Sequence, residues 1–118
     1  MRELPHNHGT SHEFLEARPD EEIFGKASDM FSLIGDSTRL KILWILCHSE
    51  ECVINIAAAI DMSSPAVSHH LKVLKQNGII VSRREGKEAY YRLADTQEAK
   101  IIHEAVDKML DIKCGLTG

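Results

Sequence analysis

The hydrophobic pattern of this chain changes its period at Asn77-Gly78. Before this dipeptide, apolar residues recur every three or four positions, which is typical of amphipathic helices. After it come two β-prone runs, 79–84 and 89–93, separated by a polar segment that predicts a hairpin tip. Apolar residues return to helical spacing after Thr96. The expected order is α-α-α-α-β-β-α, a mainly α fold with one β-hairpin.

The 118 residues suit one compact domain. We expect residues 1–19 to form a flexible arm, because they are polar and lack helical periodicity. Residues 20–113 are expected to form the domain and 114–118 a C-terminal tail. No apolar run approaches the roughly 18 residues that a membrane span needs, and no apolar signal segment is visible at the N-terminus. Three cysteines cannot all pair within one chain. Since no signal segment is visible either, we expect a cytoplasmic location with reduced thiols.

The formal net charge of −4 hides an uneven distribution. Residues 64–92 carry six basic and two acidic side chains, whereas the segments on both sides are acidic. A local basic patch matters more for binding a polyanion than the total charge. The central segment is therefore the candidate nucleic-acid surface.

Two short helices joined by a turn at 61–63, followed by a basic hairpin, are typical of a winged helix-turn-helix. The second of these helices must bury Val67, Leu71 and Leu74, so its opposite side faces out. Hydroxyls, an imidazole and lysines on that side suit base edges and phosphates. The predicted DNA-binding residues are Ser64, Ala66, Ser68, His69, Lys72 and Lys75 on this helix, and Arg83, Arg84 and Lys87 at the hairpin tip. The alternative is a solvated basic face on a small α+β domain.

Four segments together resemble the ArsR/SmtB family of dimeric bacterial transcriptional repressors. They are GDSTRLKIL at 35–43, ECVINIA at 51–57, SPAVSHHLKVL at 64–74 and GKEAYYRL at 86–93. The likeness runs from about residue 20 to residue 112. It implies a homodimer whose first and last helices pack across a two-fold axis. It also implies binding to a palindromic operator as a repressor, and release by an inducer.

Apolar stripes on the first and last helices favour a dimer independently of the family. A small monomer would leave such stripes exposed, and exposed apolar patches usually mark interfaces. The alternative is that both stripes close the core of the monomer. The residues concerned are Phe24, Met30 and Phe31 on the first helix, and Ile102, Val106, Met109 and Leu110 on the last.

Many members of the family respond to metal ions. The family segment E-L-C-V-C-D corresponds here to residues 50–55, where Cys52 matches the first cysteine and Ile54 replaces the second. Some relatives complete this site from the N-terminal arm, and a cysteine with two or three histidines suits tetrahedral zinc. The expected site for a zinc or cadmium inducer comprises His6, His8, His12 and Cys52; the alternative is a solvated arm. The family's second metal site is expected to be lost, because its positions hold Asp95, Gln97, Lys108 and Asp111 here and a lysine repels a cation.

Two other interpretations stay open. Oxidation of two cysteines among Cys47, Cys52 and Cys114 is the rival inducer chemistry. A winged helix that contacts protein or RNA is a second alternative. We do not expect an enzyme or an organic cofactor, because no nucleophile, phosphate-loop or zinc-protease motif is present in the sequence.

Overall fold

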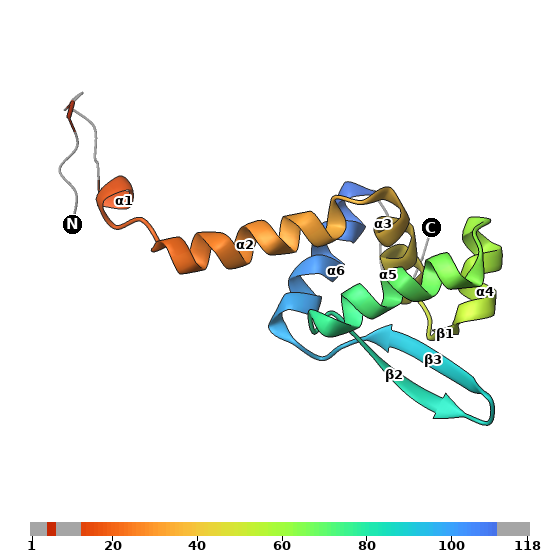
Figure 1. Cartoon of the computed structure of the whole chain (residues 1–118). Coiled ribbons are helices and arrows are strands. Elements are labelled where there is room, and N and C mark those ends of the chain that lie inside the picture. Colours follow the sequence, from red (N-terminus) through yellow and green to blue (C-terminus); the bar gives the residue numbers. More distant parts are fainter. Residues whose placement is uncertain (1–4, 7–12, 111–118) are drawn as a thin grey trace.

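The structure, a computed structural model, describes residues 5–6 and 13–110. In chain order its elements are α1 (Glu13–Glu16), α2 (Glu21–Ile34), α3 (Ser37–Leu46), β1 (Glu51–Cys52), α4 (Val53–Ile60), α5 (Ser64–Gln76), β2 (Ile80–Glu85), β3 (Glu88–Leu93) and α6 (Gln97–Met109). The expected mainly α fold with a β-hairpin is confirmed (Figure 1). Two elements are additions: α1 lies inside the segment expected to be an arm, and β1 begins where only a polar break was expected. His8, His12, Asp111 and Cys114 lie outside the described residues.

Helix α3 is the centre of the domain and packs against α2, α4, α5 and α6. Asp36 starts it as an N-cap, because its carboxylate accepts a hydrogen bond from the Arg39 backbone N–H at 3.0 Å. Residues 42–47 form a continuous apolar run, and Ile42 and Leu43 within it are fully buried. Trp44 is the exception: it lies on the outward side of α3 with 41% of its surface exposed.

A tight turn joins α4 to α5. Asp61 ends α4 in the left-handed region, at φ 56° and ψ 52°, where Asp is better tolerated than most side chains. Ser63 then caps α5 by accepting a hydrogen bond from the Ala66 N–H at 3.3 Å. Val67, Leu71 and Leu74 are fully buried, so the predicted inner face of α5 is confirmed.

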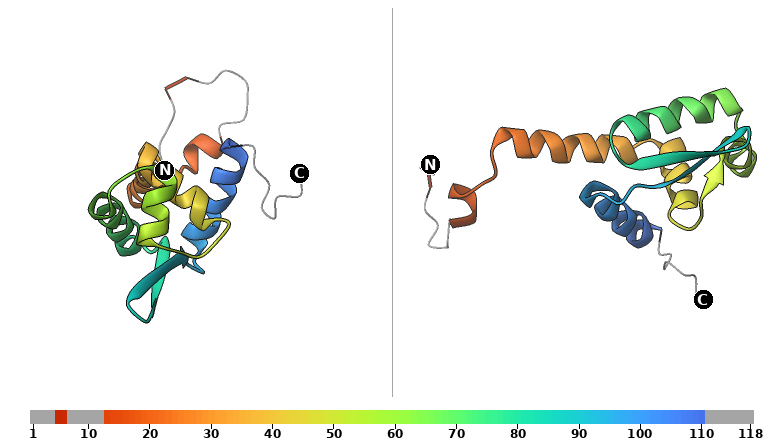
Figure 2. Two further views of the ribbon diagram at one scale, coloured as in Figure 1. Left: turned by 90° about the vertical axis from the view of Figure 1, so that its right-hand side faces the viewer. Right: turned by 90° about the horizontal axis from the view of Figure 1, so that it is seen from below.

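The sheet is antiparallel with strand order β1-β3-β2. Strands β2 and β3 form the hairpin, in which Glu85 pairs with Glu88 across a two-residue turn. Gly86 adopts φ +63° in that turn, a conformation that glycine adopts without strain. Strand β1 is only two residues long, and it adds to β3 by pairing Glu51 with Tyr91 and Cys52 with Tyr90. The hairpin projects from the helical body as a wing (Figure 2).

Helix α6 returns to the body and packs against α3 and α2. Its N-cap is Thr96, whose hydroxyl oxygen accepts from the Ala99 N–H at 3.2 Å and donates to the Gly78 carbonyl at 3.1 Å. This hydroxyl therefore ties the start of α6 to the end of α5. Ile102 and Val106 complete the core. Within the described residues, no helix combines the length and apolar character needed to cross a bilayer.

Candidate nucleic-acid interface

The outward face of α5 carries the candidate base- and phosphate-binding residues. Successive residues of a helix are rotated by about 100°, so positions 69, 72 and 76 lie opposite the buried Val67 and Leu71. His69, Lys72 and Gln76 are all exposed. Gln76 was missed by the sequence analysis, although its spacing of seven from His69 places it on the same face. An amide at this position suits hydrogen bonds to base edges or phosphates.

The other predicted residues of α5 flank this face. Ser68 and Lys75 are exposed, whereas Ser64 and Ala66 are half-buried in the first turns of the helix. The Lys75 ammonium donates a hydrogen bond to the Ser82 hydroxyl at 2.8 Å. Lys75 therefore joins α5 to the base of the wing.

The two adjacent histidines of α5 have different surroundings. His69 is exposed, whereas His70 is mostly covered, with only 18% of its side chain exposed. The His70 Nδ1 atom lies 3.5 Å from the Arg39 guanidinium and 4.0 Å from the Asp36 carboxylate. Backbone N–H donation by Arg39 is the main reason why the pKa of Asp36 lies below its usual value. His70 thus braces α5 against the start of α3, and His69 is left to face solvent.

Arg39 extends this brace to the end of α2. Its guanidinium donates to the backbone carbonyls of Leu33 at 2.8 Å and Ser32 at 3.0 Å. These carbonyls belong to the last turn of α2, where acceptors lack their usual helical partners; the Ser32 carbonyl also accepts from the backbone N–H of the C-cap Gly35 at 3.3 Å. One arginine side chain therefore connects α2, α3 and α5.

The three predicted cations of the wing also differ from one another. Arg84 and Lys87 are exposed, and neither has a hydrogen-bond or ion-pair partner among the described residues. Side chains alternate between the two faces of a strand, so Arg84 shares the face of Ser82, the side that contacts α5. Arg83 occupies the opposite face, where two carboxylates surround it. Charge and position along the chain predict one shared role for these three residues, because neither property reveals an ion pair.

The candidate metal-binding residues are only partly within the described chain. Cys52 is a free thiol that is 7% exposed and lies at the start of α4. His6 is exposed, and the other two arm histidines lie outside the described range. Among residues 5–6 and 13–110, no three histidine, cysteine or acidic side chains are grouped closely enough to hold a metal ion. The described residues alone therefore do not make a complete metal site.

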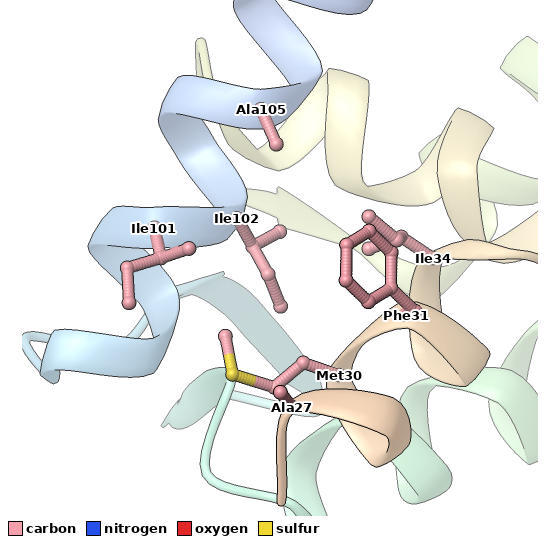
Figure 3. Close-up of a pocket in the computed structure, with 7 residues that line it drawn as sticks. All are labelled: Ala27, Met30, Phe31, Ile34, Ile101, Ile102 and Ala105. Atoms are coloured by element: carbon pink, nitrogen blue, oxygen red, sulfur yellow. The ribbon is translucent and has the colours of Figure 1, made fainter. Parts of the chain in front are cut away.

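An apolar groove runs between α2 and α6 (Figure 3). It has a volume of about 230 Å³ and no charged side chain in its lining. Phe31, from α2, is 73% exposed, and Ile101, from α6, is 48% exposed. The remaining lining residues are Ala27, Met30, Ile34, Ile102 and Ala105.

A helix-turn-helix with a basic wing defines the chain as a winged helix-turn-helix domain. A family profile described as "Bacterial regulatory protein, arsR family" matches residues 36–82, which span α3 to the start of β2. The repressor SmtB of Mycobacterium tuberculosis is 37% identical over 90 residues, which cover 76% of this chain and 67% of that protein. The chain belongs to the ArsR family.

Two further comparisons agree with this assignment. A cadmium resistance regulatory protein, the CadC homolog of Staphylococcus aureus, is 39% identical over 77 residues, or 64% of each chain. The structure is similar to the homodimeric winged helix-turn-helix DNA-binding domain Mb0332 from Mycobacterium bovis, with a TM-score of 0.65 and 28% identity. That similarity covers 89% of this chain and 91% of the other. The chain thus spans about two thirds of the length of these two relatives and nearly all of this structural neighbour.

Proposed function

We propose that this protein represses transcription by binding a palindromic operator as a homodimer, and that an inducer releases it. The observation that carries the proposal is the position of Lys72 and His69 on the outward face of α5, beside a wing that presents Arg84 and Lys87. A helix with this face enters a major groove, and the cations of the wing reach the adjacent backbone. Family membership supports the same activity.

The exposed apolar face of α2 and α6 supports the homodimer. Ile23 and Phe24 are 54% and 48% exposed in the first turns of α2, and Met109 is 56% exposed at the end of α6. Contact between this apolar surface and water is unfavourable. Packing against the same face of a second copy shields the surface from water. The homodimeric state of the Mycobacterium bovis domain supports the same arrangement here.

Salt dependence tests whether the protein binds duplex DNA. Six phosphate contacts, from Lys72, Arg84 and Lys87 of two protomers, predict that affinity falls about 1,000-fold between about 50 and about 200 mM salt. We would measure fluorescence anisotropy of a labelled duplex selected by this protein from a randomised pool, with a scrambled duplex of the same composition as the control. Equal affinity for both duplexes, or an affinity that does not change with salt, would contradict sequence-specific DNA binding.

We further propose that the inducer is a zinc or cadmium ion bound by Cys52 with His6, His8 and His12 of the arm. The relative from Staphylococcus aureus is named for cadmium resistance, and a thiolate with imidazoles is a donor set that suits both metals. Cys52 lies directly before α4, the first helix of the helix-turn-helix. A ligand that pulls on this residue therefore acts on the element that supports α5.

Titration with zinc or cadmium tests this inducer. We expect either metal to weaken the DNA complex of the wild-type protein. Cys52→Ser should need at least a tenfold higher metal concentration for the same release, because a hydroxyl is a much poorer ligand for these ions. Cys47→Ser is the matched control, since it makes the same substitution at the end of α3. A normal response of Cys52→Ser would exclude the proposed site, and a response to oxidant but not to metal would favour the thiol-redox alternative.

A further inference from the structure

Arg83 is the most completely engaged cation of the wing. Its Nε donates to both carboxylate oxygens of Glu50, at 3.0 and 3.1 Å, and its Nη2 donates to Glu50 at 2.6 Å. Its Nη1 donates to Glu85 at 2.9 Å. A guanidinium that donates to one carboxylate from two of its nitrogens forms a bidentate ion pair, whose geometry is specific. Arg83 therefore has a fixed orientation, with two acidic neighbours.

This ion pair spans the sheet. Arg83 of β2 pairs in register with Tyr90 of β3, and Tyr90 pairs with Cys52 of β1. Glu50 comes directly before β1, so the arginine reaches across β3 to meet it. On the way the guanidinium lies over the Tyr90 ring, 5.1 Å from its centroid. One side chain thus connects the outer strand of the wing with the segment that leads into α4.

The charges of the cluster keep Arg83 from serving as a simple phosphate contact. Hydrogen bonds from Arg83 hold the pKa of Glu50 below its usual value, and the two carboxylates raise the pKa of Arg83. One guanidinium faces two carboxylates, so the cluster carries a formal net negative charge. The two carboxylates repel an approaching phosphate, so Arg83 is a poorer phosphate contact than Arg84 or Lys87.

The outer part of the wing needs such an anchor. Ile80 is buried at the base of the hairpin, but Arg83, Arg84, Glu85 and Lys87 are all exposed further out. An isolated two-stranded ribbon is only marginally stable in water. The body contacts the wing at its base, through β1 and through the hydrogen bond from Lys75 to Ser82, and the pair Glu50–Arg83 adds a side-chain contact further out along β2.

We propose that Glu50 and Arg83 form a clamp that positions the wing for DNA binding, with Arg83 as a positioning residue rather than a phosphate contact. The inference rests on the proposed function, because it concerns how the wing meets DNA. The clamp holds the face of Ser82 and Arg84 toward α5. Breaking it leaves every other cation of the interface in place but lets the wing move.

Glu50→Gln gives opposite results for a clamp and for simple electrostatics. The substitution removes a negative charge near the DNA, so electrostatics alone predicts tighter binding. A clamp predicts that binding weakens about threefold to tenfold, because a neutral amide holds a guanidinium less firmly than a carboxylate. Glu88→Gln is the matched control: it removes a carboxylate from the wing at a position with no ion pair among the described residues, and it should bind at least as tightly as wild type. Glu50→Gln binding as tightly as Glu88→Gln would overturn the clamp.

A double-mutant cycle distinguishes positioning from direct contact. If the clamp acts as a unit, Arg83→Gln in the Glu50→Gln background weakens binding little further. It also leaves the salt dependence of that background unchanged. If Arg83 contacted a phosphate, adding Arg83→Gln would make the negative slope of log affinity against log salt less steep by about 1.8 for the two protomers. That result would show the proposal to be wrong.

Hydrogen exchange of the protein without DNA separates this inference from the proposed function. In Glu50→Gln, amide exchange should accelerate in residues 82–90 and stay unchanged in α5, with the same thermal midpoint as wild type within a few degrees. Unchanged exchange in the wing would overturn the clamp even if the protein binds DNA. If wild type binds no duplex while the wing responds as expected, the clamp stands and the proposed function fails.

Discussion

We expect Lys72→Glu to abolish operator binding and to leave a folded dimer. Lys72 is exposed at the centre of the outward face of α5, between His69 and Gln76. A dimer would present the new carboxylate twice, once on each proposed recognition helix. Loss of two contacts, with repulsion in their place, lowers affinity by at least about 100-fold near physiological salt.

The neutral variant separates contact from repulsion. The slope of log affinity against log salt is negative, and Lys72→Ala should make it less steep by about 1.8, because one phosphate contact per protomer is lost. We would measure both variants by anisotropy with the selected duplex, and confirm dimerisation by sedimentation. A Lys72→Glu protein that binds within about threefold of wild type would place α5 outside the groove.

Lys100→Glu is the charge-matched control for this prediction. Lys100 is exposed on α6, which lies across the core from α5 (Figure 2). Its ammonium lies 3.7 Å from Asp95, an exposed pair that contributes little to stability. We therefore expect Lys100→Glu to bind the duplex nearly as well as wild type.

The sequence predicted the elements whose evidence is local. The buried stripe of α5 and the turn of the hairpin both depend on residues within a few positions of one another. Strand β1 was missed because two residues carry no periodic signal, and their partners Tyr90 and Tyr91 lie about forty positions away. A strand of this length exists only because β3 is already in place beside it.

The site was predicted less completely for the same reason. Spacing identified His69 and Lys72, and it could also have identified Gln76. The separate roles of His70 and Arg83 depend on contacts with Arg39 and Glu50, which are 31 and 33 positions away in the chain. Such contacts decide whether a basic side chain is available to DNA, and no local pattern encodes them.

The largest effect on assembly is expected from Ile101→Asp. Ile101 lines the groove between α2 and α6, where it is 48% exposed in the single chain. The contact across a two-fold axis repeats each substitution, so two carboxylates would enter an apolar interface without partners. We expect the dimer dissociation constant to rise at least about 100-fold, giving a monomer at micromolar concentration.

The monomer should also lose operator affinity, although its DNA-binding face is unchanged. A palindrome is bound tightly because the dimer holds two recognition helices at the spacing of two half-sites. Without that link each half-site is bound independently, and the gain of about 100-fold or more from a linked second contact disappears. Sedimentation and anisotropy on the same samples would show the two losses together.

Ile54→Asp is the matched control for the dimer, since it introduces the same carboxylate at another exposed isoleucine. Ile54 is 59% exposed on α4, a helix that packs mainly against α3, α5 and the sheet. The control should remain dimeric, and both variants should keep a cooperative thermal transition because neither side chain belongs to the buried core. If Ile101→Asp stays dimeric under these conditions, the groove between α2 and α6 is not the interface. The exposed face of α2 would then have to be covered in some other way.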